Sequence, residues 1–237
     1  MTSISFPVGC IAVDFGGTLA GRGDEKADGT AFVAALAQCS GWSVPDAFAA
    51  ALDQAMKAAR ARDRANLHQT PFVEIMHDAA DRAECILPGE KLWSERVFEH
   101  LPDARIDEAA AKAVRDLAER GVRLVLASNT RWSLSARART LREAGIGDAF
   151  HALVLSTDIG VLKPHPDFYR AVLDAAGCPA AEVLFVGDTA DKDIGPPRSF
   201  GMQALLVAPV WEHDPQGEES GLPYFADLPA LWEAARR

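Results

Sequence analysis

Two aspartates stand just behind short apolar segments, where a carboxylate could hold a cation or attack a substrate. Asp14 follows the apolar residues 8–13, and Asp188 stands two positions after the apolar residues 183–186. If both segments are neighbouring strands, the two carboxylates lie close together and repel each other unless a cation lies between them. Carboxylate oxygens are hard ligands that favour Mg²⁺. The sequence therefore predicts a magnesium site that contains Asp14 and Asp188.

A carboxylate beside a metal ion can also act as a nucleophile. The metal would neutralise the charge of a bound phosphate, and Asp14 would then attack phosphorus to form an aspartyl-phosphate. Asp14 would be nucleophile and metal ligand at once. Because a single aspartate at the end of a strand is more often a turn or capping residue, this hypothesis depends on what the other segments place beside it.

Five short apolar segments indicate a buried parallel sheet. Most of them are continuous rather than alternating, as is typical of strands covered on both faces. They span residues 8–13, 122–127, 152–155, 183–186 and 204–208, and helix-like segments separate the last four at residues 134–144, 167–176 and 194–200. This alternation predicts a doubly wound α/β fold with a parallel sheet, in which ligands bind at the carboxyl ends of the strands.

A long stretch without strand signals lies between the first two apolar segments and predicts a helical insertion. Four parts of it carry apolar residues at helical spacing, at residues 30–39, 45–66, 71–83 and 90–100. Pro45 and Pro71 are expected in the first turns of their helices. Residues 107–120, closed by Gly121, are expected to return to the core as a helix.

The polar residues behind the first four strands follow an order that resembles the four motifs of the haloacid dehalogenase superfamily. They are Asp14-Phe15-Gly16-Gly17-Thr18-Leu19, Ser128-Asn129-Thr130, Lys163-Pro164, and Gly187-Asp188-Thr189 with Asp193. The resemblance implies a Rossmann-like catalytic core of residues 1–19 and 105–237, with residues 20–104 as a helical cap. It also implies a hydrolase, above all a Mg²⁺-dependent phosphatase of a small phosphorylated metabolite.

The same resemblance implies how a metal would be held. The main-chain carbonyl of Gly16 would join the carboxylates of Asp14 and Asp188 as the third protein ligand. Asp193 would hold the metal's waters or orient a catalytic lysine from behind. Asp191 lies close by in the sequence and competes for that role.

Three further residues would act on the phosphoryl group, and a fourth would support the nucleophile. Ser128 and Asn129 would bind its oxygens, and Lys163 would bind it while keeping Asp14 ionised through pre-placed positive charge. Thr18 would position the loop of the nucleophile. The alternatives are that Ser128 and Asn129 only cap the following helix and that Lys163 is a surface lysine in a loop.

Position 16 departs from the phosphatase pattern. In phosphatases of this superfamily the residue two after the nucleophile is an aspartate, which protonates the leaving group and later activates water, whereas here it is Gly16. Because general acid/base catalysis is typically worth about 10²–10⁴ in rate, its loss should slow the turnover of alkyl phosphates strongly. A phosphatase for good leaving groups, such as acyl or enol phosphates, would tolerate the loss, as would one that borrows an acid from the cap or the substrate.

Other reactions stay open as alternatives. A phosphonatase would use a cap lysine as a Schiff base, for which Lys57 is the candidate, and a dehalogenase would displace halide, which has no need of the metal ligand Asp188. A catalytically silent protein that binds a metal and phosphate is the third alternative. In a capped enzyme the cap supplies the substrate-reading groups, and the candidates there are Arg60, Arg62, Arg64, His68 and His77.

Composition limits the partners and the compartment. The chain has 237 residues, a net charge of −10 and a balance of 49% hydrophobic and 24% charged residues that is typical of a globular protein. The negative charge disfavours nucleic acid as a partner. Four cysteines without metal-site spacing, and the lack of a leader or a membrane-length apolar run, predict a cytoplasmic protein that does not bind membranes. We expect a monomer or a homodimer.

Overall fold

A parallel sheet forms the centre of the protein in the computed structural model, which describes residues 4–21, 28–41, 43–87, 89, 96–101, 103–210 and 222–236. Its strands are β1 (Cys10–Val13), β2 (Arg123–Ser128), β3 (Phe150–Leu155), β4 (Val183–Gly187) and β5 (Gln203–Leu206). All pairs are parallel and the order is β3-β2-β1-β4-β5. The α/β class and the parallel sheet are therefore confirmed, and each strand overlaps its predicted segment.

Both faces of the sheet are buried, because successive side chains of a strand point to opposite faces. In β1, Ile11 and Val13 belong to one hydrophobic cluster, whereas Cys10 and Ala12 belong to another. None of these four residues is exposed to solvent. A strand covered on both sides has no polar face, which explains why the apolar segments of the sequence are continuous.

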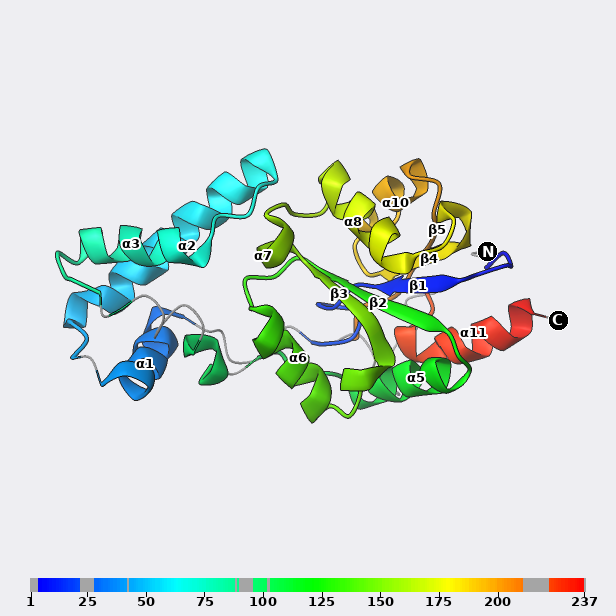
Figure 1. The fold of residues 1–237 in the computed structure, drawn as a ribbon, viewed down its shortest axis with the longest axis horizontal. Helices are drawn as coiled ribbons and strands as arrows, with labels where there is room; N and C mark the ends of the chain where they lie inside the picture. Colours follow the sequence, from blue (N-terminus) through cyan, green and yellow to red (C-terminus); the bar gives the residue numbers. More distant parts are fainter. Residues whose placement is uncertain are drawn as a thin grey trace.

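Helices cover the two faces of the sheet. They are α5 (Glu108–Glu119), α6 (Leu134–Glu143), α8 (Pro166–Ala176), α10 (Gly195–Ser199) and α11 (Leu228–Ala235). Figure 1 shows α5 and α11 on one side of the strands and α8 and α10 on the other. Apolar residues of α5 and α11 pack with Ile11 and Val13, while residues of α8, Phe168 among them, pack with Cys10 and Ala12.

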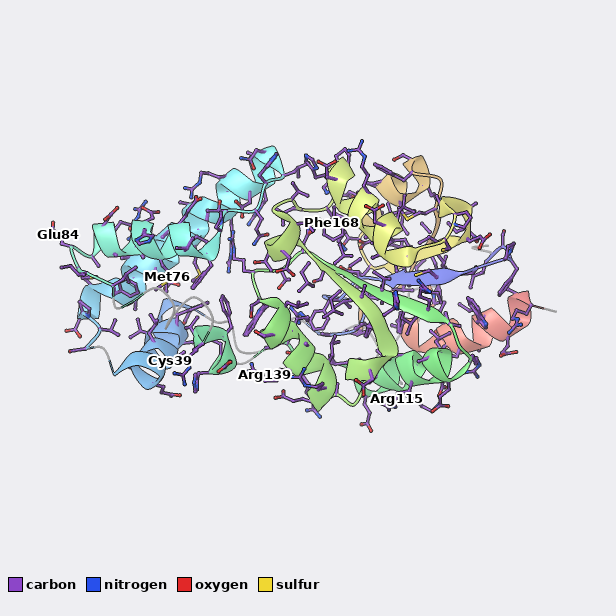
Figure 2. The ribbon with its side chains drawn as sticks, in the orientation of Figure 1. Cys39, Met76, Glu84, Arg115, Arg139 and Phe168 are labelled. Atoms are coloured by element: carbon purple, nitrogen blue, oxygen red, sulfur yellow. The ribbon has the colours of Figure 1, made fainter. Side chains whose placement is uncertain are left out.

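The segment between β1 and α5 is helical, as the sequence predicts. It contains α1 (Gly29–Ser40), α2 (Asp46–Asn66) and α3 (Phe72–Arg82). Their apolar sides form a hydrophobic cluster distinct from the two at the sheet, with Met76 fully buried in it (Figure 2). Pro45 and Pro71 stand one residue ahead of α2 and α3 as their N-caps, not inside the first turns where we expected them.

The predicted helix at residues 90–100 is only partly described. Residues 90–95 lie outside the described residues, and Val97–Glu99 form a single 3₁₀ turn, η1. This turn is held against the core by Arg139 of α6, whose guanidinium donates to the main-chain oxygens of Phe98 and Glu99 at 2.9 and 2.5 Å (Figure 2).

The insertion meets the core again at the carboxyl end of α2. The N–H of Gln69 donates to the carbonyl of Gly160 at 2.9 Å, and the N–H of Leu162 donates to the carbonyl of Leu67 at 2.9 Å. Leu67 takes the left-handed conformation, with φ 60°, to make this turn. The connection therefore ties α2 to the residue directly before Lys163.

The remaining elements are short. They are α7 (Ser156–Ile159), α9 (Ala190–Asp193) and the 3₁₀ turns η2 (Gly147–Ala149), η3 (Ala180–Glu182) and η5 (Phe225–Asp227). Among the described residues, none of the helices combines the length and the apolar character that a bilayer crossing requires.

Candidate active site at the carboxyl ends of the strands

Three carboxylates converge where β1 and β4 end. Val13 and Val186 are paired across the two strands, and the N–H of Asp14 donates to the carbonyl of Val186 at 2.9 Å. The side chains of Asp14, Asp188 and Asp193 each offer an oxygen within 4.8 Å of the others. The parallel register therefore brings together residues that are far apart in the sequence, as predicted for Asp14 and Asp188.

Lys163 lies between two of these carboxylates. Its Nζ donates to Oδ1 of Asp14 at 2.6 Å and to Oδ1 of Asp193 at 2.8 Å. Oδ2 of Asp193 accepts the N–H of Thr189 at 3.1 Å, so both oxygens of Asp193 are engaged. Of the two aspartates considered for support of this lysine, Asp193 is buried beside it, whereas Asp191 is exposed.

Burial sets the electrostatics of this cluster. Burial raises the pKa of Asp14, against the lowering effect of Lys163, and the nearby carboxylates of Asp193 and Asp188 raise it further. Burial alone would lower the pKa of the Lys163 ammonium, but Asp14 and Asp193 outweigh it and the pKa is raised. Burial also raises the pKa of Asp188. The ammonium of Lys163 balances only one of the three negative charges that Asp14, Asp188 and Asp193 carry when ionised. A further cation would therefore be attracted to this cluster.

The loop behind Asp14 depends on a glycine at one position and leaves space at its neighbour. Gly17 has φ 98°, and a Cβ there would stand 2.2 Å from Oδ2 of Asp188. A Cβ on Gly16 would meet no atom of the described chain within 4 Å. Thr18 is buried, and its hydroxyl stands 3.5 Å from Oδ2 of Asp14, the outer limit of a hydrogen bond. The described chain thus leaves space for a Cβ at position 16.

Ser128 and Asn129 lie at the carboxyl end of β2. Ser128 ends the strand and is 3% exposed. The amide of Asn129 holds the main chain of Lys163 from both sides, because its Nδ2 donates to the carbonyl at 3.0 Å and its Oδ1 accepts the N–H at 2.7 Å. Asn129 thus places the lysine, a contact that the sequence did not reveal.

A pocket of about 620 Å³ opens between the insertion and the core. Its described lining residues are Phe15, Arg60, Asp63, Arg64, Leu67, Gln69, Asp103, Ala104, Asn129, Thr130, Arg131, Trp132, Arg137, Leu162, Lys163, Pro164 and Lys192. Arg60 and Arg64 are thus the two cap candidates that the structure brings to the pocket. Arg62, His68 and His77 are exposed residues outside this lining, as is Lys57.

Two arginines of the pocket, the partly buried Arg131 and the buried Arg137, were missed in the sequence. Arg131 pairs with Asp63 of α2, and it also donates to the carbonyl of Thr70 at 3.0 Å. Arg137 pairs with Asp103 at 2.7 Å, and its guanidinium lies 3.6 Å from the ring centre of Phe15.

Of the two arginines, Arg137 was the easier to recognise in the sequence as a residue that needs an ion-pair partner. It stands four residues before Leu141, and both are buried on the packed side of α6. A basic residue on the apolar side of a helix requires a partner. The separation of Arg131 from Asp63 in the sequence gave no comparable sign.

Comparisons with known proteins agree with this arrangement. Residues 8–201 match the family described as "Hydrolase: haloacid dehalogenase-like hydrolase". A glyceraldehyde 3-phosphate phosphatase of Methanocaldococcus jannaschii is 40% identical over 63 residues, which are 27% of this chain and 28% of that protein. A phosphatase of Mycobacterium tuberculosis is 30% identical over 146 residues, which are 61% of this chain and 65% of that protein.

Solved structures show the same fold over a larger part of the chain. The 2-haloacid dehalogenase of Pseudomonas syringae superposes with a TM-score of 0.64 at 17% identity, covering 96% of this chain and 99% of that one. The sequence matches above span less than two thirds of either curated relative, whereas the family match spans most of this chain. The sheet order, the motif residues at its edge and this match lead to one conclusion: the chain belongs to the haloacid dehalogenase-like hydrolases.

Proposed function

We propose that this hydrolase is a Mg²⁺-dependent phosphatase that acts on a small phosphorylated metabolite through an aspartyl-phosphate at Asp14. The observation that carries the proposal is the position of Asp188, the third carboxylate of the cluster. Lys163 already pairs with Asp14 and Asp193, so Asp188 stands in the cluster without an ammonium in hydrogen-bond contact among the described residues. A cation beside Asp188 would relieve the repulsion among the three carboxylates.

The donor set fits Mg²⁺. The carboxylates of Asp14 and Asp188 are hard ligands, and we propose the main-chain carbonyl of Gly16 as the third. Asp193 would position Lys163 instead of binding the metal, because both of its oxygens already accept hydrogen bonds. When bound, Mg²⁺ supplies charge neutralisation for the phosphoryl oxygens.

The residues of the chain would then carry out two displacements. A carboxylate oxygen of Asp14 attacks phosphorus, the bond from phosphorus to the leaving oxygen breaks, and the leaving group departs with that electron pair. Lys163 keeps Asp14 ionised in its buried place and, with Ser128, offers donors to the phosphoryl oxygens. Water then attacks the aspartyl-phosphate, releases phosphate and restores the Asp14 carboxylate.

Gly16 limits which leaving groups can depart. An alkoxide requires a proton as it leaves, and Gly16 has no side chain to supply one. A carboxylate or an enolate is stable enough to leave without it, so we propose acyl, enol or aryl phosphates as the preferred substrates. Residues 20–104 would form a cap over the core that reads the rest of the substrate, since the pocket is lined from both sides.

Halide displacement is the second candidate. A halide also leaves without a proton, so this reaction does not need an acid at position 16. It gives no role to Asp188, however, and the similarity to the solved dehalogenase is one of fold. The phosphonatase alternative has less support, because Lys57 is exposed on α2 and is outside the described lining of the pocket. A catalytically silent protein would keep the same pocket.

The test is phosphate release from matched acyl, aryl and alkyl phosphates with and without Mg²⁺, for the wild type, Asp14→Asn and Gly16→Asp. We expect release that requires Asp14 and Mg²⁺ and favours good leaving groups. A Cβ at position 16 meets no atom of the described chain within 4 Å, and Gly16→Asp should raise kcat for alkyl phosphates by about 10²-fold or more if the new carboxyl acts as the acid.

Detection of a covalent adduct on Asp14 distinguishes the phosphatase from the alternative functions. Mass spectrometry after rapid acid quench should find a phosphate adduct on the peptide that contains Asp14. Equal, background release by wild type and Asp14→Asn on all probes would contradict the proposal. Release of halide from 2-haloacids that requires Asp14 would then support the dehalogenase, and no covalent adduct on any probe would support the silent protein.

A further inference from the structure

We propose that the pocket between the insertion and the core selects phosphorylated substrates that carry a second anionic group, bound by Arg60 and Arg64 of α2. This inference rests on the proposed phosphatase function and deepens it, because it names the charge of the leaving group. The second anion is a carboxylate or another phosphate, and the test below distinguishes the two.

The charge of the pocket is opposite to that of the protein. The chain has a net charge of −10, yet basic side chains outnumber acidic ones among the described residues of the pocket. The basic residues are Arg60, Arg64, Arg131, Arg137, Lys163 and Lys192, and the acidic residues are Asp63 and Asp103. A concave basic site on an acidic protein attracts small anions.

The two acidic side chains of the pocket are already engaged. Asp63 pairs with Arg131 and also accepts the N–H and the hydroxyl of Thr70. Asp103 accepts from Arg137 at 2.7 Å and from the hydroxyl of Thr140 at 2.5 Å. Neither carboxylate is therefore available to neutralise the remaining basic residues.

Three basic residues of the pocket have no ion-pair partner in the part of the chain that the structure describes. These are Arg60, Arg64 and Lys192, whereas Lys163 is occupied by the nucleophile and Asp193. The Nε of Arg137 is buried and also lacks a hydrogen-bond partner among the described residues. The pocket thus keeps more donors for an anion than the phosphoryl group alone would use.

Arg60 and Arg64 are placed to act together. They stand four residues apart, so they are neighbours on one face of α2. Arg62 lies between them in the sequence, is equally exposed and is not part of the described lining. The carboxyl end of α2 reaches the core near α7 in Figure 1, where Leu67 and Leu162 share a hydrogen bond.

The pocket consequently receives basic side chains from both the core and the insertion. Lys163, which pairs with the nucleophile, lines it from the core, and Arg60 and Arg64 line it from the insertion. A volume of about 620 Å³ suits a small metabolite with two charged groups. Guanidinium groups bind carboxylates and phosphates through paired hydrogen bonds, and binding of the second anionic group would help to orient the phosphoryl group.

The experiment uses three aryl phosphates that differ only in the group opposite the phosphate. They are 4-carboxyphenyl phosphate, 1,4-phenylene bisphosphate and the uncharged 4-carbamoylphenyl phosphate. With Mg²⁺, we expect kcat/KM for at least one anionic probe to exceed that for the carbamoyl probe by about tenfold, as for a hydrogen bond to a charged group. The difference should lie mainly in KM, and the better anionic probe identifies the second group.

The matched variants are Arg60→Gln with Arg64→Gln, and Arg62→Gln as the control on the same helix. The double variant should lose the preference to within about twofold, while Arg62→Gln should keep it. Circular dichroism checks that each variant is folded, and the two single variants, each expected to lose part of the preference, replace the double variant if it is not. An equal preference in wild type and double variant, or none in the wild type, overturns the inference.

Binding separates this inference from the proposed function. If the wild type releases phosphate from no probe, the phosphatase proposal fails, and calorimetric titration of the same probes with Mg²⁺ still decides the role of the arginines. Tighter binding of an anionic probe than of the carbamoyl probe, lost in the double variant alone, supports the inference. Equal binding of all three probes, or binding of none, overturns it.

Discussion

At the scale of single residues, hydrogen bonds to neighbouring side chains fix the position of the lysine in the site. Lys163 is fixed by two carboxylates at its ammonium and by Asn129 at its main chain. The sequence predicted Asp14, Lys163 and Asp188 at one edge because each follows a strand of the same parallel sheet. It left open whether Asp193 or Asp191 supports the lysine, because that choice depends on which side of the short helix α9 faces the core.

Gly17 and Gly16 form a matched pair for a test of stability. Gly17→Ala places a methyl group in a left-handed conformation and against the carboxylate of Asp188, so we expect the free energy of unfolding to fall by about 1–3 kcal/mol. Gly16→Ala has open space and should change it by less than about 1 kcal/mol. Urea denaturation followed by circular dichroism measures both. Equal losses for the two variants would contradict this account of the loop.

At the scale of elements, the apolar pattern predicted each strand that the structure describes, but not the links between elements. Buried parallel strands are continuous apolar segments, so their positions are visible in the sequence to within a few residues. The contact of Asp63 in α2 with Arg131 behind β2 joins the insertion to the core. It was not predictable, because nothing local in either segment requires the other. For Arg137 the apolar side of α6 indicates that a partner is needed, but nothing local identifies Asp103 as that partner.

Asp63 and Asp78 allow the strength of this link to be measured. Asp63→Ala leaves Arg131 without its carboxylate in a mostly buried place, so we expect a loss of about 2–4 kcal/mol in the free energy of unfolding. Asp78→Ala removes the exposed pair with Arg82 and should cost no more than about 0.5 kcal/mol. Chemical denaturation of both variants gives the comparison. A loss at Asp63 as small as that at Asp78 would show that the link is not a stabilising one.

At the scale of the whole molecule, the pocket is lined by residues of the helical insertion and of the core. The helices of the insertion share one hydrophobic cluster, which also contains Ala136 of α6, and the sheet has two others. The sequence predicted the helices of the insertion from the long interval without strand signals, and the cap with its bounds at residues 20–104 stays a prediction. It did not predict the basic character of the pocket, since the basic side chains come from α2, from the segments behind β2 and β3, and from α6 and α9, and meet only in the folded chain.

Metal binding should be visible in the stability of the folded protein. We propose that Mg²⁺ binds the native cluster and not the unfolded chain, so at about 100 times its Kd it should add about 2.7 kcal/mol, or roughly 5–10 °C in Tm. Asp188→Asn should show a much smaller shift, and excess EDTA should reverse the effect in the wild type. Differential scanning calorimetry measures this without substrate. The same shift in wild type and Asp188→Asn would place the metal elsewhere.

The open space at Gly16 bears on how glycine came to stand at this position during evolution. Some glycine codons become aspartate codons by a change of one base, and no atom of the described chain lies within 4 Å of a Cβ placed at position 16. Crowding at the Cβ therefore does not require glycine at position 16, and the glycine points to selection on the reaction or to its relaxation. A mutational library at this codon, selected for growth on an alkyl phosphate, would reveal how short the path to a general phosphatase is.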